Sequence, residues 1–249
     1  MRGRSTINHS RDFAGRQTTP EERDRRLAEI FERLAPRYDR LLDVQTLGLH
    51  RHWRRVLVRM MRPRPGDRIL DVAGGSGEMA IRLSGADRRV IVLDRSLPMI
   101  EAGRSRTPAP VAWVAGLART LPFRTGSMDA VVCAFGVRNV TYVEAALKES
   151  LRVLRSGGWF YCLEVSRPWA PLRPLYRGYC HYLVPRLGAW ITRAPEAYDY
   201  LVESILEFPD RETIKNAMET AGFVSVHYRC LTLGVVCIHA GRKPEPGDS

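Results

Sequence analysis

The sequence contains very little lysine. Its only lysines are Lys148, Lys215 and Lys243, although the chain of 249 residues carries 39 basic residues and a formal net charge of +12 at pH 7. A surplus of positive charge ordinarily suggests nucleic acid or an anionic membrane surface as a partner. Here nearly all of it is arginine, which a GC-rich coding sequence produces without any partner. We therefore expect no nucleic-acid partner, while weak attraction to a membrane surface stays open.

Cysteine is scarce, and long apolar runs are missing. No apolar run reaches 18 residues, and no apolar segment follows the basic N-terminus, so we expect neither a membrane-spanning helix nor a signal peptide. The cysteines are odd in number, lie in apolar runs and form no Cys-x-x-Cys pair. This pattern predicts reduced core residues of a cytoplasmic protein, rather than zinc ligands or disulfides. The five are Cys133, Cys162, Cys180, Cys230 and Cys237.

A glycine-rich turn is the most informative feature that is present. An apolar strand over 68–72 leads into Gly74, Gly75, Ser76 and Gly77, and a helical pattern follows. Glycines allow positive φ and close approach of a ligand to the backbone, and the start of the helix offers unpaired N–H groups. The spacing does not match the six-residue dinucleotide fingerprint, and no Lys-Ser/Thr follows for a phosphate-binding loop.

Two acidic residues suggest which ligand this turn takes. Asp71 stands near the end of the first strand, and Asp94, followed by Arg95, closes the next apolar strand. An acid at that second position of a doubly wound sheet accepts hydrogen bonds from a ribose diol. Without phosphate-binding apparatus, this favours a nucleoside such as S-adenosylmethionine over NAD or ATP. The alternative is a tight turn with no ligand.

Strand and helix patterns alternate along the rest of the chain. This predicts an α/β fold with a doubly wound, Rossmann-like sheet and an antiparallel last strand, with ligands at the C-terminal strand ends. Predicted strands cover 68–72, 89–93, 111–114, 129–135, 159–164, 224–230 and 234–240, and predicted helices lie from 77, over 97–104, over 141–154 and from 210.

A single domain is expected over 19–243, between a mobile tail at 1–18 and a short tail at 244–249. Residues 19–66 read as a helical cap that begins with Thr19 as N-cap and Pro20 at the first helical position. Residues 168–208 form an insertion rich in Trp and Tyr. Its aromatic side chains suit covering a flat apolar substrate, or they simply pack the insertion onto the core.

Several further segments carry a family resemblance. Together with the glycine turn they resemble the C-methyltransferases of ubiquinone and menaquinone biosynthesis, which methylate a ring carbon of a polyprenyl hydroquinone. The resemblance extends from about residue 27 to 243, and its carriers are 37–39, 48–53, 70–77, 135–141, 163–168, 198–205 and 231–236.

The resemblance implies S-adenosylmethionine as cofactor, with contacts at Ser76, Asp94, the Leu117–Ala118 pair and Ala134. Some positions depart from the family pattern. Where the family usually has Asp or Asn at 117, an acid at 119 and often Ser at 134, this chain has Leu117, Arg119 and Ala134. We therefore expect weakened but real cofactor binding.

By the same resemblance, Arg138 and Asn139 are the proposed catalytic element. A guanidinium is a poor base, so we favour electrostatic stabilisation of a developing phenolate. A structural role for Arg138, tied to Asp129 or Glu164, is the alternative. Tyr38 and His50 are second candidates, for orienting the ring or carrying its proton, or else they are ordinary packing residues.

Two rival functions remain. One is a divergent, non-catalytic member that serves as an auxiliary subunit of a quinone-biosynthesis complex, which the departures at 117, 119 and 134 favour. The other is an RNA methyltransferase, which rests on the charge alone. A polyprenyl hydroquinone is the expected substrate. Peripheral contact with the inner face of the membrane, and a quinone-biosynthesis complex or a homodimer, stay open as further associations.

Overall fold

The structure is a computed structural model that describes residues 19–85, 87–107, 110–184, 186, 202 and 204–248. The tail predicted over 1–18 lies outside the described residues, as does 187–201, the central part of the predicted insertion. Residues 244–248 of the predicted C-terminal tail contain no helix or strand.

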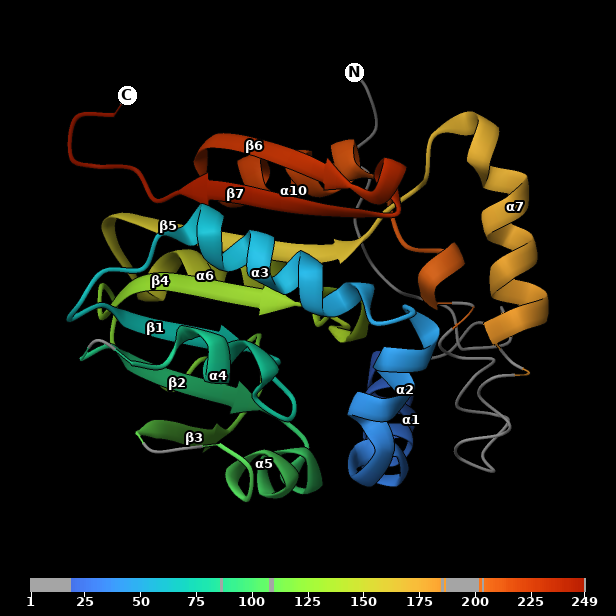
Figure 1. Ribbon diagram of the computed structural model, residues 1–249. Coiled ribbons are helices and arrows are strands. Elements are labelled where there is room, and N and C mark those ends of the chain that lie inside the picture. Colours follow the sequence, from blue (N-terminus) through green and yellow to red (C-terminus); the bar gives the residue numbers. More distant parts are fainter. Residues whose placement is uncertain are drawn as a thin grey trace.

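A seven-stranded sheet with the order β3-β2-β1-β4-β5-β7-β6 forms the centre of the molecule (Figure 1). The first five strands are parallel, and β7 is antiparallel to both of its neighbours. This confirms the predicted doubly wound α/β fold with an antiparallel last strand. The strands are β1 Arg68–Val72, β2 Arg89–Asp94, β3 Val111–Ala115, β4 Met128–Ala134, β5 Leu154–Val165, β6 Val224–Leu231 and β7 Val236–Arg242.

Helices cover both faces of this sheet. In Figure 1, α3 (Leu49–Met61) and α4 (Glu78–Leu83) lie in front of the sheet, and α6 (Val143–Val153) and α10 (Arg211–Ala221) lie behind it. The central strands are accordingly apolar on both sides, as buried parallel strands are. Because the chain order reverses between β1 and β4, a cleft is expected at their carboxyl ends. The short helix α5 (Leu97–Arg104) follows β2 toward that cleft.

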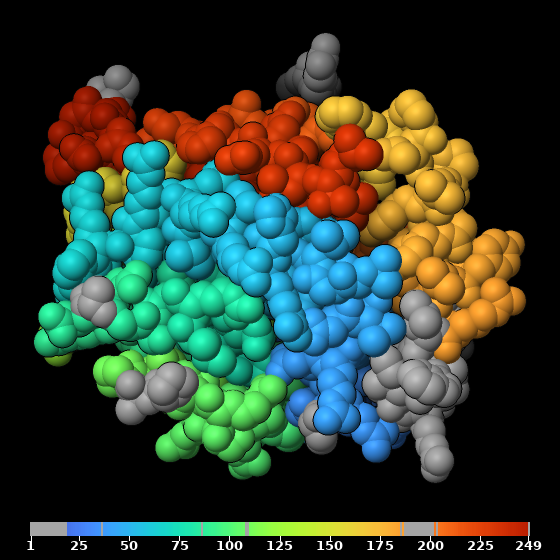
Figure 2. Space-filling model, viewed as in Figure 1, coloured from blue at the N-terminus to red at the C-terminus, as the bar shows by residue number. Residues whose placement is uncertain are grey.

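Two further helices belong, together with α3, to residues 19–66, the N-terminal cap. α1 (Pro20–Leu34) begins as predicted, since the Thr19 hydroxyl accepts the Glu22 N–H at 3.2 Å. A 3-10 turn, η1 (Ala35–Arg37), leads into α2 (Tyr38–Gln45), which the sequence did not predict. Both helices lie beyond the carboxyl ends of the central strands (Figure 1). In Figure 2 the blue N-terminal segment forms a continuous surface between the red C-terminal strands and the green β2–α5 region.

The described part of the insertion includes η3 (Ala170–Leu172), α7 (Arg173–Gly178), the π-helical segment η4 (Tyr179–Leu183) and helical residues at 202 and 204–206. The Tyr179 hydroxyl donates to the Gln45 carbonyl at 2.6 Å, so the insertion contacts the cap. Among the described residues, no helix is both long and apolar enough to span a bilayer.

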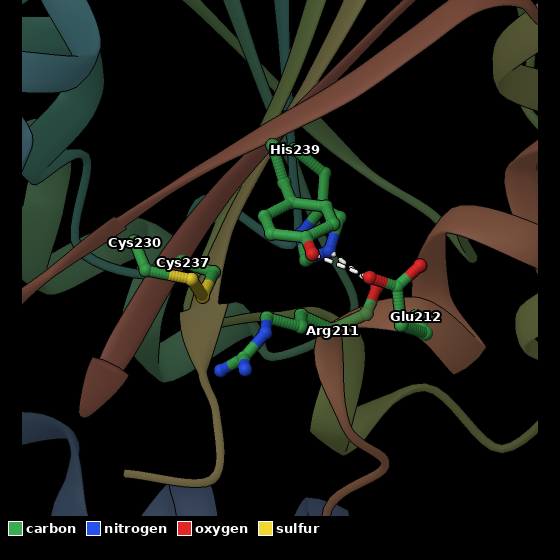
Figure 3. The surroundings of a disulfide bond; sticks show 6 residues. Arg211, Glu212, Cys230, Cys237 and His239 are labelled. Atoms are coloured by element: carbon green, nitrogen blue, oxygen red, sulfur yellow. Dashed lines mark hydrogen bonds between the residues drawn. A yellow bond between two sulfur atoms is a disulfide. The ribbon is translucent and has the colours of Figure 1, made fainter. Parts of the chain in front are cut away.

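One prediction about the cysteines is wrong. Cys230 and Cys237 form a disulfide, whereas Cys133, Cys162 and Cys180 are buried thiols as expected. Cys230 and Cys237 are direct partners in the antiparallel β6–β7 pair, with their Cα atoms 4.1 Å apart. Such close cross-strand pairing brings two sulfur atoms together. The spacing of cysteines along the sequence cannot reveal it, because it depends on how the hairpin pairs. Figure 3 shows this disulfide beside Arg211 and His239.

Candidate functional site

A pocket lies under α1 at the carboxyl ends of β1, β2 and β4, and its empty space, open solvent at the mouth included, is about 950 Å³. The segments that follow the parallel strands form its floor, and α1 forms its roof through apolar and acidic side chains. Its walls include Ala73–Ser76, Leu93–Ser96, Gly116–Arg119, Ala134–Gly136, and Asp24, Leu27, Ala28 and Phe31 of α1.

The glycine turn after β1 requires its glycines for two reasons. Gly75 and Gly77 have φ values of +56° and +77°, which favour glycine. A Cβ atom on Gly77 would also lie 2.6 Å from the Trp113 ring, and one on Gly74 would lie 2.7 Å from the Asp71 carboxylate. The turn therefore keeps the backbone bare where it faces the pocket.

Two residues with side chains also have positive φ at this site. Ala73, just after β1, has φ +53°, and Phe135, just after β4, has φ +60°. Both follow neighbouring strands at the point where the sheet order reverses. Backbone strain of this kind is concentrated at functional sites, because surrounding contacts must hold it in place.

Asp94 links the ends of β1 and β2. Its carboxylate accepts the Gly75 N–H at 2.8 Å and the Ser96 N–H at 2.9 Å, and it forms part of the pocket wall. Burial raises the pKa of this carboxyl, while the two backbone N–H groups oppose the shift. The prediction that Asp94 faces the ligand space next to the glycine turn agrees with this geometry.

Asp71 lies beneath the turn rather than on the pocket wall. The residue is 1% exposed, and neither carboxylate oxygen has a hydrogen-bond partner among the described residues. Burial raises its pKa to about 7. Gly77 is likewise beneath the surface, whereas the other predicted cofactor residues line the pocket. Those are Gly74, Gly75, Ser76, Asp94, Arg95, Leu117, Ala118 and Ala134.

Asp24 fastens α1 over the pocket. Its carboxylate forms ion pairs with Arg95 at 3.1 Å and Arg119 at 2.9 Å, and it accepts the Thr141 hydroxyl. Arg23, the preceding residue, donates to the Arg138 carbonyl at 3.1 Å. The cap is thus held to the loops after β2, β3 and β4. Sequence reasoning missed Asp24, because nothing in the local pattern indicates contacts about a hundred residues away.

Arg138 pairs with Glu164, one of the two acids that the sequence offered. Its Nη1 donates to Glu164 at 2.6 Å, and both side chains are buried. Asp129, the other candidate partner, pairs with Arg68 and Arg155 instead. The Arg138 guanidinium lies 5.7 Å from the centre of the Phe135 ring, which itself lines the pocket.

Asn139 and Tyr38 reach the pocket wall. The Asn139 amide donates to the Phe135 carbonyl at 3.3 Å, which holds the strained end of β4. Burial raises the pKa of Tyr38, so its phenol stays protonated near neutral pH and can donate a hydrogen bond. Ser76 also lines the pocket, but its hydroxyl donates to Asp39 at 2.8 Å, which ties α2 to the glycine turn.

His50 is not on the pocket wall. Its Nε2 lies 2.8 Å from an oxygen of Asp43, and its Nδ1 contacts Nη1 of Arg54. Arg54 does line the pocket, and the sequence analysis had not selected it. The only sequence signal for Arg54 is the Gly-Leu-His-Arg-His-Trp segment directly before it. That segment draws attention to His50 and not to Arg54, which lies one helical turn later.

Comparison with known proteins shows the family of this chain. The model of the ubiE/COQ5 methyltransferase family matches residues 19–243. The chain belongs to this family. A "Ubiquinone/menaquinone biosynthesis C-methyltransferase UbiE" of Rubrivivax gelatinosus is 44% identical over 234 residues, which cover 94% of this chain and 93% of the relative. A mitochondrial "2-methoxy-6-polyprenyl-1,4-benzoquinol methylase" of Danio rerio is 38% identical over a region that covers 96% of this chain and 86% of the relative.

Solved structures show the same fold at lower identity. An S-adenosylmethionine-dependent methyltransferase from Thermotoga maritima superposes with a TM-score of 0.64 at 22% identity, covering 87% of this chain and 99% of its own. The solved structures show the fold alone, whereas the family model and the curated relatives confirm the predicted family and its class, a methyltransferase enzyme of quinone biosynthesis. The individual roles predicted for the site residues remain predictions.

Proposed function

We propose that this family member transfers a methyl group from S-adenosylmethionine to a ring carbon of a polyprenyl hydroquinone. The observation that carries the proposal is the pocket at the carboxyl ends of β1 and β4, in which Asp94 is held against a bare glycine turn. The printed names of the relatives, which describe C-methylation in quinone biosynthesis, support the acceptor.

The residues of the pocket fit the proposed cofactor. Asp94 keeps acceptor oxygens beside the turn for a ribose diol, and the glycines leave room for a ligand against the backbone. Leu117 and Ala118 offer an apolar surface for an adenine ring. When bound there, S-adenosylmethionine would supply the electrophilic methyl group.

The departures at 117 and 134 are expected to weaken the cofactor complex. Each neutral hydrogen bond lost is worth roughly 0.5 to 1.5 kcal/mol, or about 2- to 12-fold in affinity. Leu117 still lies on the wall, where its side chain can pack on the adenine. Calorimetric titration with S-adenosylmethionine should show measurable heat. No heat at millimolar ligand would defeat the proposal.

In the proposed mechanism, the chain supplies alignment, dryness and charge stabilisation. Alignment of two reactants can contribute roughly 7 to 11 kcal/mol, and α1, held through Asp24, covers part of the pocket and so limits the access of water. A ring hydroxyl must lose its proton to make the ring carbon nucleophilic. Arg138 does not line the pocket and is paired with Glu164, so in this proposal it acts on the resulting phenolate through space, and the Tyr38 phenol, which lines the pocket, can donate to a ring oxygen.

A second candidate function is an auxiliary subunit that binds the cofactor but does not turn over. Leu117, Arg119 and Ala134 favour it, because two of them remove expected polar contacts and Arg119 instead pairs with Asp24. The test is methyl transfer to short-chain demethylated benzoquinol and naphthoquinol, with the product identified by mass spectrometry. Asp94→Ala is the binding-defective control. Cofactor binding without turnover on either acceptor would favour the auxiliary subunit.

We expect the enzyme to work at the cytoplasmic face of a membrane, where its acceptor is dissolved. Large apolar side chains are exposed near the pocket end of the sheet, among them Leu47, Trp169 and Leu233. We also propose that the aromatic insertion over 168–208 covers the acceptor. Sedimentation with vesicles that contain or lack anionic lipid tests the membrane contact, and binding to neither would contradict it.

A further inference from the structure

Arg54 is a buried arginine on the pocket wall that none of the preceding roles explains. It lies on α3 and is 4% exposed, yet it lines the same cavity as the glycine turn. Its guanidinium carbon lies 5.2 Å from the centre of the Phe135 ring. Its Nε has no hydrogen-bond partner within the described part of the chain. A buried charge in this state carries a desolvation cost that a ligand can offset.

No carboxylate forms a salt bridge with Arg54 among the described residues. The nearest acids act on it only at longer range: Asp71 lies beneath the glycine turn, and Glu78 is engaged by Arg82 at 2.7 Å. Burial therefore lowers the pKa of Arg54. An arginine that remains charged, buried and unmatched on a cavity wall is suited to bind an anionic group of a ligand.

A chain of side chains holds this guanidinium in place. The Asp43 carboxylate can only accept from His50 Nε2, so that nitrogen carries the proton. His50 Nδ1 is then the acceptor for the Arg54 Nη1–H. Arg51 donates to the same Asp43 carboxylate at 2.9 Å and so fixes it in turn. His50 is thereby a positioning residue for Arg54, rather than a group that faces the acceptor.

The place of Arg54 in the pocket indicates which part of the ligand it meets. The proposed ribose contact, Asp94, is the last residue of β2, and the proposed adenine contact, Leu117, follows β3. Arg54 instead neighbours Tyr38 and Phe135, at the β1–β4 side of the cavity. A nucleoside anchored by Asp94 would extend its 5′ substituent toward that side. In S-adenosylmethionine this substituent ends in an amino acid.

We propose that Arg54, positioned by His50, binds the α-carboxylate of the amino-acid end of the cofactor. The inference rests on the proposed function, because it takes S-adenosylmethionine as the ligand. It assigns a binding role to a residue on the cap rather than on the sheet. The N-terminal helix α3 thus contributes to cofactor recognition as well as to the core.

The test compares two ligands that differ only at this end. S-adenosylhomocysteine carries the amino acid, and 5′-methylthioadenosine has the same nucleoside and sulfur without it. Both are titrated calorimetrically into the wild type, into Arg54→Met, into Arg54→Lys and into a matched control, Arg55→Met, which alters the exposed neighbour on α3. Melting curves accompany each variant.

Arg54→Met should bind S-adenosylhomocysteine about 10- to 100-fold more weakly, as expected for a lost charge-assisted hydrogen bond. Binding of 5′-methylthioadenosine should change less than about twofold, which also shows that the pocket is still folded. Arg54→Lys should fall between, and Arg55→Met should match the wild type. Equal losses for both ligands, or no loss for either, would overturn the assignment while leaving the proposed function intact.

Two further measurements separate the remaining possibilities. In the wild type, S-adenosylhomocysteine that lacks only its carboxylate should bind about 10- to 100-fold more weakly than the intact ligand, a result that needs no variant to fold. Unchanged affinity would overturn the role of Arg54. Absence of binding by every nucleoside would overturn both this inference and the proposed cofactor.

The positioning role of His50 has its own test. His50→Asn offers an oxygen where Nδ1 accepts, whereas His50→Phe offers none. The first should keep most of the preference for S-adenosylhomocysteine over 5′-methylthioadenosine, and the second should lose it. Equal preferences in the two variants would limit His50 to packing.

Discussion

The buried ion pair between Arg138 and Glu164 allows a structural role to be separated from a chemical one. The two side chains are 4% and 1% exposed, and their nearest atoms lie 2.6 Å apart. Arg138→Met alone would leave Glu164 buried without its partner, at a cost of about 3 to 5 kcal/mol in the free energy of unfolding. Loss of activity in that single variant would therefore not distinguish poor folding from poor chemistry.

The double variant Arg138→Met/Glu164→Gln removes both charges together. Replacing a buried ion pair by uncharged side chains of similar size often changes the free energy of unfolding little. We therefore expect the double variant, measured by urea unfolding, to regain most of the stability that the single variant loses. The Gln oxygen can still accept the Val165 N–H, which Glu164 accepts at 2.9 Å in the wild type. If Arg138 stabilises the phenolate, kcat should stay about 10²- to 10³-fold below wild type. The calorimetric affinity for S-adenosylhomocysteine should stay within about twofold.

The assay pairs kcat for a short-chain demethylated quinol with urea unfolding on the same preparations. A matched control is Arg155→Met, which removes a half-exposed arginine of β5, the strand that also carries Glu164, from its pair with Asp129 on β4. That change should cost less than about 1 kcal/mol and leave kcat unchanged. Recovery of kcat together with stability in the double variant would refute a chemical role for Arg138 and assign it to structure.

Three other properties can be checked directly. Burial lowers the pKa of His239 to about 4. As pH falls, this imidazole is therefore protonated in the unfolded chain before it is protonated in the native one. Urea unfolding should show about 3 kcal/mol lost between pH 7 and pH 4, a loss that His239→Gln should lack. Burial raises the pKa of Asp71 to about 7, so the pH dependence that it gives to the free energy of unfolding is opposite to that of His239. As pH rises, the native Asp71 carboxyl keeps its proton to a higher pH than the unfolded one does. The free energy of unfolding should therefore fall by about 4 kcal/mol between pH 4 and pH 7.5, and this fall should be absent in Asp71→Asn. Thiol titration of the denatured chain should find three reactive thiols before reduction and five after it, because Cys230 and Cys237 are joined; five before reduction would contradict the disulfide.

The parts of the fold that the sequence predicted are those with a local signal. The helix over Leu97–Arg104 has a Ser96 cap and a proline in its first turn, and its predicted bounds are confirmed. Strand β5 was predicted to start at Trp159, yet it starts at Leu154, because Leu154 pairs with Met128 across an irregular register. Strand pairing depends on residues distant in sequence, so neither this start nor the cross-strand disulfide follows from the local pattern.

The same division applies to the site. The glycine turn and Asp94 are recognisable, since φ requirements and an acid at a strand end are properties of short segments. Asp24 and Arg54 are not, because they reach the pocket only after the cap folds over the sheet. His50 was selected for its chemical type, although its neighbours Asp43 and Arg54 give it a positioning geometry.

The contacts of the N-terminal cap explain why an arginine suits position 119. Arg119 does not replace a lost cofactor contact, because its guanidinium pairs with Asp24 on α1 and lies 4.8 Å from the centre of the Tyr142 ring. An acid at this position would face the Asp24 carboxylate and repel it. Arg119 therefore helps to hold α1 over the pocket, a contact that an acid at 119 could not make. An acid restored at 119 without a change at Asp24 is accordingly not expected to tighten cofactor binding.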